Sequence, residues 1–192
     1  LFRSDRQTLV DIYNSKITKW NDAAILVLNP DLKDYLPADP ITVVHRSDSS
    51  GTTEIFTKAL TAFSPDWTAG GASAVEWPAD KAGNGVGGKG NQGVAAAVIN
   101  TPNSIGYVEL SFAISNKMPF ASMLNKAGKT VVANADSLAS TMTDFASAFS
   151  DKLTATIVDA PGDGSWPISG YTYLILHTKN MTDGIKAQKL LE

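Results

Sequence analysis

Residues 41–60 read ITVVHRSDSSGTTEIFTKAL, and this stretch determines the fold that the sequence predicts. The β-branched residues of 41–44 favour an extended strand. The polar residues 45–51 are rich in turn formers and end that strand. From Thr52 onward the apolar residues recur at helical spacing, and Ser50 is placed to cap the helix. The stretch therefore predicts a strand, a short turn and a helix in direct succession.

A helix that begins directly after a Ser/Gly turn offers a place for an anion. Its first-turn N–H groups lack intrahelical partners, and the helix dipole puts partial positive charge there. Ser50 and Thr52 add hydroxyl donors, and Gly51 lets the backbone approach a ligand closely. Arg46 supplies a charged fork that fits an oxyanion, and Asp48 is placed to orient it. On these residues alone, an ordinary strand–turn–helix with a surface ion pair remains an equal alternative.

The composition is that of an ordinary globular protein, and it narrows the possible functions. Of the 192 residues, 43% are hydrophobic and 18% are charged. The net charge of −3 argues against a nucleic acid as partner, which would select a basic face. The chain has no Cys, which excludes disulfides, thiolate metal sites and a Cys nucleophile. No apolar run reaches the roughly 18 residues that would predict a transmembrane span.

The glycine-rich stretch 83–93 contains most of a nucleotide-binding loop, because Gly83 to Lys89 fits G-x-x-x-x-G-K. The next residue is Gly90, where the motif requires a Ser or Thr for magnesium, so a nucleotide site is not expected. We interpret the glycines as positions where the backbone comes close to a ligand cleft and a helix then begins. Lys89 either adds positive potential near that cleft or is a solvated surface lysine.

The rest of the chain alternates between helical and extended patterns, which favours an α/β sandwich with a mixed or largely parallel sheet. Helices are expected over 9–13, 23–28 and 137–149, and strands over 74–78, 105–109, 128–133 and 165–176.

Four motifs in this order resemble the phosphate-binding proteins of bacterial Pst-type ABC transporters. Residues 44–57 fit the pattern V-x-R-x-D-x-S-G-T-[ST]-x-x-F-T. Residues 77–95 resemble W-P-x-G…G-G-K-G-N-x-G-V-A, and residues 105–109 read IGYVE. The fourth motif begins with WPI at 166–168. The resemblance covers nearly the whole chain.

The resemblance implies the α/β fold of type II periplasmic binding proteins, with a three-layer α/β/α lobe and a mixed sheet. Residues 1–192 would form one module, in which about 1–160 are the second lobe of the family. Residues from about 161 to 192 would form the hinge and a partial return to the first lobe. The glycine-rich segment that opens the family's first lobe has no match here, so a missing lobe or a partner chain is expected.

The resemblance also implies a function, namely binding of inorganic phosphate as the extracytoplasmic solute-binding component of a phosphate ABC transporter. The expected partners are phosphate and a transporter membrane component, with no cofactor. The phosphate contacts carried over from the family are Arg46, Ser50, Gly51 and Thr52, supported by Asp48 and Thr53. The alternative is a diverged, non-transport extracellular module of the same family with a sensing, scaffold or matrix role.

Catalysis is not expected from this sequence. Ser50 or Thr52 would need an activating base or a metal cluster, and no Asp/His group has metal-ligand spacing. His45 is the nearest base in the sequence, but it directly precedes Arg46 on the expected strand. The two side chains should therefore point to opposite faces. His177 lies far away in the sequence.

Overall fold

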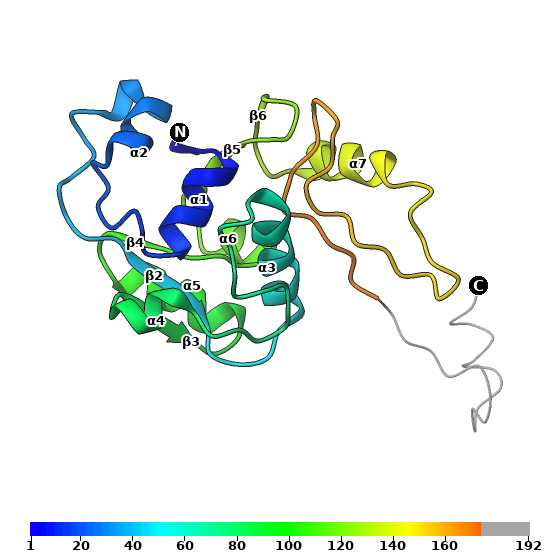
Figure 1. Cartoon of the computed structure of the whole chain (residues 1–192), viewed down its shortest axis with the longest axis horizontal. Helices are drawn as coiled ribbons and strands as arrows, with labels where there is room; N and C mark the ends of the chain where they lie inside the picture. The colour runs from blue at the N-terminus through cyan, green and yellow to red at the C-terminus, as the bar shows by residue number, and fades with distance from the viewer. Residues whose placement is uncertain (174–192) are drawn as a thin grey trace.

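The computed structural model describes residues 1–173 as alternating helices and strands (Figure 1). The strands are β1 (Arg3–Ser4), β2 (Thr42–Arg46), β3 (Gly85–Gly88), β4 (Ser104–Ile105), β5 (Ser122–Leu124) and β6 (Thr130–Val131). The helices are α1 (Arg6–Tyr13), α2 (Ala23–Leu28), α3 (Gly51–Phe63), α4 (Pro78–Ala82), α5 (Gly90–Asn100), α6 (Leu110–Ser115) and α7 (Ala135–Asp144), with a 3₁₀ turn at Pro30–Leu32.

The strands divide between two small sheets. One has the order β3-β2-β4, with β2 parallel to both neighbours. The other has the order β1-β5-β6 and is mixed, since β1 is parallel to β5 while β5 is antiparallel to β6. The expected α/β class with a mixed sheet is confirmed, and the parallel sheet is the one that carries the organising strand.

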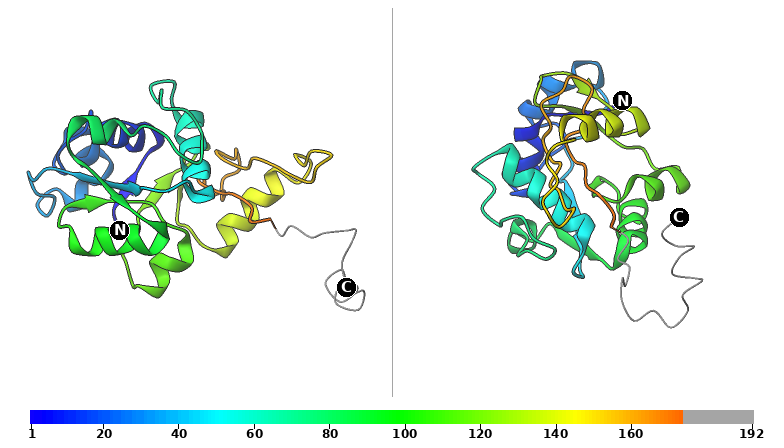
Figure 2. Two further views of the ribbon diagram at one scale, coloured as in Figure 1. Left: turned by 90° about the horizontal axis from the view of Figure 1, so that it is seen from below. Right: turned by 90° about the vertical axis from the view of Figure 1, so that its right-hand side faces the viewer.

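Strand β2 is buried on both faces, which places it in the middle of three layers. Val43 belongs to the core formed with α1 and α3, while Val44 lies beside Val94 and Val98 of α5 around Gly106. Two views at right angles show the helices on either side of this sheet (Figure 2). Because side chains alternate along a strand, Arg46 shares the α5 side with Val44.

Packed aromatic rings form the centre of the core next to β2. The Tyr13 and Phe56 rings meet edge to face at 4.7 Å, and the Phe56 and Tyr107 rings stack at 4.3 Å. Trp77 lies 5.9 Å from both tyrosine rings. Large rings bury much apolar area at low conformational cost, so this cluster fixes the start of α3 relative to β2.

All four strands expected outside 41–60 are wrong in whole or in part, and of 128–133 only Thr130–Val131 is a strand, β6. Residues 74–78 form no strand, because Pro78 begins α4 and the preceding Trp77 turns into the core; proline suits the first position of a helix. Of 105–109, only Ile105 is in a strand, β4. Residues 165–173 form no strand, since their backbone contacts go to separate loops and to α7, and residues 174–176 lie outside the described part.

Candidate anion-binding site

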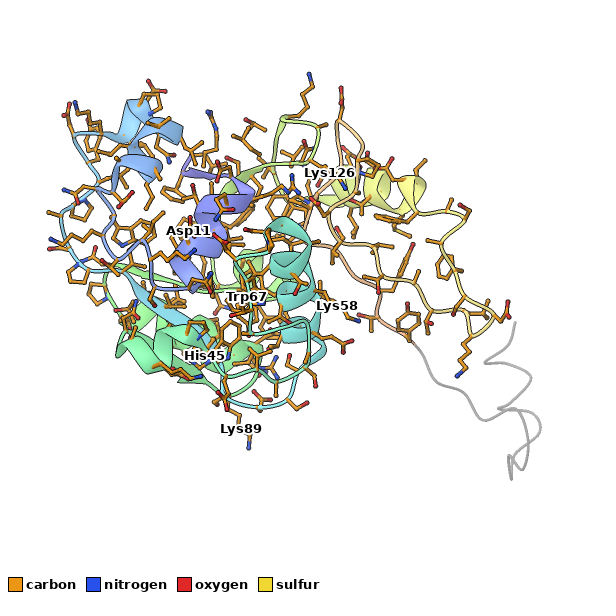
Figure 3. The ribbon with its side chains drawn as sticks, in the orientation of Figure 1. Asp11, His45, Lys58, Trp67, Lys89 and Lys126 are labelled. Carbon is orange, nitrogen blue, oxygen red and sulfur yellow. The ribbon has the colours of Figure 1, made fainter. Side chains whose placement is uncertain are left out.

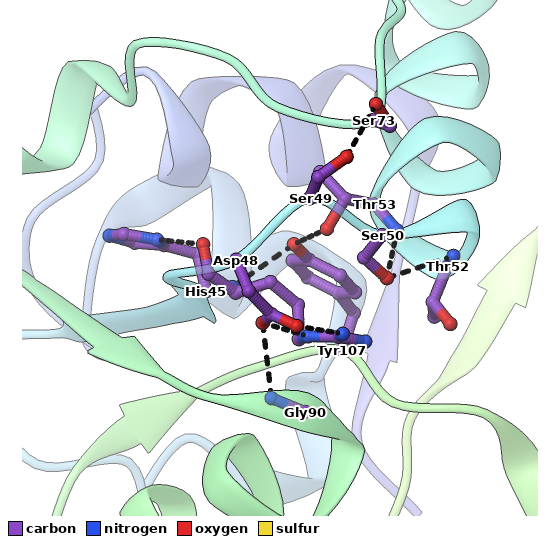
Figure 4. Close-up of polar contacts among 10 residues, drawn as sticks. His45, Asp48, Ser49, Ser50, Thr52, Thr53, Ser73, Gly90 and Tyr107 are labelled. Carbon is purple, nitrogen blue, oxygen red and sulfur yellow. Dashed lines mark hydrogen bonds and ion pairs between the residues drawn. The ribbon is translucent and has the colours of Figure 1, made fainter.

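The candidate site lies where β2 ends and α3 begins. Arg46 is the last residue of β2, and Ser50 is the residue that caps α3. The loop between them is held by the segment that follows α3, because the Ser50 N–H donates to the Ser73 carbonyl at 2.8 Å. The Ser49 and Ser73 hydroxyls are also hydrogen-bonded, at 2.9 Å (Figure 4). The loop is therefore held in place by Ser73, which belongs to neither β2 nor α3.

Arg46 is held by Asp48 through two parallel hydrogen bonds. Nε donates to Oδ1 and Nη2 donates to Oδ2, each at 2.7 Å. The Arg46 side chain is only 10% exposed, so its direction is well defined. A guanidinium has five N–H donors, and two are used here. Within residues 1–173 the Nη1/Nη2 edge has no other partner, and it is an edge that can hold two oxygens of one anion. Asp48 thus orients Arg46 as expected.

Asp48 also contacts the first turn of α5, which the sequence did not indicate. Its Oδ1 accepts the Gly90 N–H at 3.1 Å. The carboxylate therefore places a negative charge at the N-terminus of α5, where the helix dipole favours it. Hydrogen bonds from Arg46 and then from Gly90 hold the pKa of Asp48 well below its usual range. The pairing with Asp48 also raises the pKa of Arg46. Both groups are therefore charged at neutral pH.

The first turn of α3 supplies the remaining donors. The Ser50 Oγ accepts the N–H groups of Thr52 and Thr53, at 3.1 and 3.3 Å. Since this oxygen is used as an acceptor, the Ser50 hydroxyl proton is free to donate to a ligand. The Gly51 N–H and the Thr52 hydroxyl have no hydrogen-bond partner within residues 1–173. Capping therefore occupies two backbone donors and leaves one N–H and two hydroxyls for an anion.

Thr53 has a different role from its neighbour. It is 1% exposed, and its Oγ1 lies 2.7 Å from the Tyr107 hydroxyl. The same Tyr107 oxygen accepts the Arg46 backbone N–H at 3.2 Å. Thr53 therefore cannot reach a ligand at the surface, and it supports the site through Tyr107.

His45 and Lys89 do not join this group. The His45 ring lies on the opposite face of β2, stacked on Trp77 at 4.9 Å and 2.8 Å from the Asp80 carboxylate. Figure 4 shows it pointing away from Ser50 and Thr52. Lys89 is exposed and its side chain extends away from the ribbon (Figure 3). The structure thus removes the nearest base from the site, as expected.

The arrangement is suited to holding a small oxyanion. Its free groups are all donors, and one of them carries a fixed positive charge. Within the described residues no group of three His, Cys, Asp or Glu side chains could hold a metal ion. In the same residues, no helix has the length and apolar character of a membrane span.

Comparison with known proteins identifies the family. Residues 2–191 match a family described as the PBP superfamily domain. The chain belongs to the PBP superfamily. The serine-rich β2–α3 turn and the Arg46–Asp48 pair are thus features of a PBP superfamily chain.

Curated relatives of this PBP superfamily chain include two named Phosphate-binding protein PstS. The one from Methanocaldococcus jannaschii is 41% identical over 180 residues, covering 89% of this chain and 46% of the relative. The one from Xylella fastidiosa strain Temecula1 is 41% identical over 186 residues, covering 96% of this chain and 49% of the relative. The chain spans about half the length of the curated relatives it matches.

A solved structure supports the fold. The structure described as a DING protein superposes with a TM-score of 0.56 and 22% sequence identity. The superposition covers 86% of this chain and 50% of the DING protein chain. At this identity the likeness concerns the PBP superfamily architecture alone.

Three contacts of the β2–α3 turn come from residues far away in the sequence, and the sequence analysis did not predict these contacts. Tyr107, Gly90 and Ser73 meet the β2–α3 turn only through the fold, from 61, 42 and 24 residues away. The IGYVE motif around Tyr107 gave a signal of resemblance, but we interpreted that tyrosine as structural. Gly90 lies in the glycine-rich stretch that we interpreted as a close approach to a ligand cleft and a helix start, but its N–H contact with Asp48 was not predicted. The hydroxyl of Ser73 had no local signal.

Proposed function

We propose that this PBP superfamily chain binds inorganic phosphate with Arg46, Ser50, Gly51 and Thr52. The observation that carries the proposal is the doubly hydrogen-bonded Arg46–Asp48 pair near the N-terminus of α3. Within residues 1–173 this pair leaves one guanidinium edge without a partner. A tetrahedral anion presents oxygens that match such a combination of fork, hydroxyls and backbone N–H. The printed names of the relatives, Phosphate-binding protein PstS, support the same ligand.

The proposal includes the place of this module in a transport system. Residues 1 to about 160 are one lobe, and residues from about 161 begin the return to a second lobe, which completes the site from the other side. The whole protein is then the solute-binding component of a phosphate ABC transporter, acting outside the cytoplasm with a membrane component as partner. It performs no catalysis, and the position of His45 on the far face of β2 supports this.

Titration with inorganic phosphate tests the proposal when two cationic residues are compared. Arg46→Ala should abolish the heat of binding in isothermal titration calorimetry, because Arg46 is the cationic side chain that residues 1–173 place at the β2–α3 turn. Lys89→Ala should only weaken binding, since Lys89 is exposed and acts through a screened field. Equal losses from the two variants would mean that the site is placed wrongly. No response of the native chain to phosphate would contradict the proposed function.

A further inference from the structure

The two halves of the candidate site are joined by one buried hydroxyl group. Tyr107 is 8% exposed and comes from the segment after β4, outside the β2–α3 turn. Its oxygen accepts the backbone N–H of Arg46 at 3.2 Å and lies 2.7 Å from Thr53 Oγ1. Arg46 carries the charge of the site, and Thr53 belongs to the first turn of α3. The phenol thus contacts both elements that supply ligand donors.

The chemistry of the phenol lets it make both contacts at once. A tyrosine hydroxyl has a single proton. Because the oxygen accepts the Arg46 N–H, the proton is free to go to Thr53 Oγ1. Burial raises the pKa of Tyr107, which keeps the group a neutral donor at physiological pH. Either hydroxyl can donate in the Tyr107–Thr53 contact, and in both cases Tyr107 links the Arg46 N–H to Thr53.

The ring of Tyr107 is fixed by the core, so its hydroxyl is a reference point and not a mobile group. The ring stacks on Phe56 with centroids 4.3 Å apart and planes 10° from parallel. Trp77 packs against it at 5.9 Å. Phe56 belongs to α3 itself, so ring and hydroxyl together fix the first turn of this helix against the end of β2.

We infer that Tyr107 is a positioning residue of the phosphate site, which sets the distance between the Arg46 guanidinium and the donors of α3. The inference rests on the proposed function. Without the hydroxyl, the Arg46 N–H and the Thr53 hydroxyl both lose a partner in a buried place, which favours a shift of the two elements. Anion binding depends on the donors meeting the same ligand, so affinity should fall before the fold is lost.

Tyr107→Phe tests the inference because it removes only the oxygen. We expect phosphate affinity to fall about 3- to 10-fold, the range of one ordinary hydrogen bond. Tyr13→Phe is the matched control. Tyr13 is fully buried in the same aromatic cluster, 6.3 Å from Tyr107, and its hydroxyl has no partner in the described part of the chain. This control should keep the native affinity.

A cycle with Thr53 separates positioning from a general loss of packing. Thr53→Val should weaken phosphate binding about as much as Tyr107→Phe, and the double variant should be no worse than the more severe single one. Thr53→Ser keeps the hydroxyl and should bind more tightly than Thr53→Val. If Tyr107→Phe does not fold, the comparison of the two Thr53 variants decides.

The outcomes distinguish this inference from the proposed function. Native affinity in Tyr107→Phe, or equal losses in Tyr107→Phe and Tyr13→Phe, would overturn the inference while the loss in Arg46→Ala still supports a phosphate site. Additive losses from Tyr107→Phe and Thr53→Val would also overturn it, because two independent defects would then act. A native chain that does not bind phosphate would refute both.

Discussion

The Arg46 guanidinium and the Asp48 carboxylate are joined by two hydrogen bonds of 2.7 Å at the end of β2. The same carboxylate accepts the Gly90 N–H of α5. The Asp48 side chain therefore orients the Arg46 guanidinium and also accepts a hydrogen bond from the N-terminus of α5. This relationship makes Asp48 important for both the site and the local fold, and its effect should depend on pH.

The contribution of Asp48 to stability should be lost in acid. Its folded-state pKa is lowered by Arg46 and Gly90, so the unfolded chain takes up the proton first as the pH falls. The contribution is therefore present above the unfolded pKa of about 4 and declines as the pH drops toward the folded value. Urea unfolding should show Asp48→Asn less stable than native at about pH 6, with a smaller difference at about pH 2.5.

Asp34→Asn is the control for this pH experiment. Asp34 is exposed and has no hydrogen bond or ion pair of its side chain within residues 1–173. Its substitution should change the free energy of unfolding little at either pH. A difference between Asp48→Asn and native that grows as the pH falls would contradict the assigned role of the carboxylate.

Ser50 should reveal two separate functions in one side chain. Ser50→Ala removes the cap of α3 and should lower the free energy of unfolding by about 1 kcal/mol. Ser50→Asp keeps a good capping residue and should stay within about 0.5 kcal/mol of native, yet it places a negative charge at the proposed anion site. Phosphate binding should therefore be lost in Ser50→Asp, although chemical unfolding remains nearly native. Retained phosphate affinity in this variant would place the ligand elsewhere.

The glycines of the site region should differ sharply in their tolerance of alanine. A Cβ at Gly88 would lie 2.6 Å from the backbone of Gly93 and Val94, so Gly88→Ala forces β3 and α5 apart. We expect a loss of about 1–3 kcal/mol in the free energy of unfolding. A Cβ at Gly51 meets nothing within 4 Å, so Gly51→Ala should be neutral or slightly stabilising. Similar losses in the two variants would contradict this packing.

Discrimination between phosphate and sulfate should be weak in this chain. The groups assigned to the ligand donate hydrogen bonds, and the Ser50 and Thr52 hydroxyls can rotate to suit either anion. Strong rejection needs a buried group that the wrong ligand leaves unpaired. Competition titrations should give affinities within about tenfold of each other. A preference for phosphate of a hundredfold or more would require an acceptor beyond the residues assigned here.

The organising stretch was predictable because its signals are local. Val43 and Val44 mark the strand, and Ser50 marks the first turn of the helix by its own hydrogen bonds to Thr52 and Thr53. The Arg46–Asp48 pair is also local, two residues apart. The local part of the candidate site was therefore open to sequence reasoning.

The remaining features depend on contacts between distant segments. Strand β1 is two residues long and exists because Arg3 pairs with Ser122 in β5, which no local pattern indicates. Residues 74–78 looked like a strand because Val75 and Trp77 flank the polar Glu76, but Trp77 is buried beside Tyr13 and Pro78 begins a helix. The domain boundary near residue 160 and the phosphate contacts themselves stay predictions.

The most direct test of the central claim is to follow the backbone amide signals of the isotope-labelled chain by NMR during a titration with inorganic phosphate. The Gly51 N–H lies at the N-terminus of α3 and has no hydrogen-bond partner within residues 1–173, so its signal and that of Thr52 should shift most, in a saturable manner. Arg46→Ala should abolish these shifts. If the largest shifts instead arise far from the β2–α3 turn, or persist unchanged in Arg46→Ala, the phosphate site is not where the structure indicates.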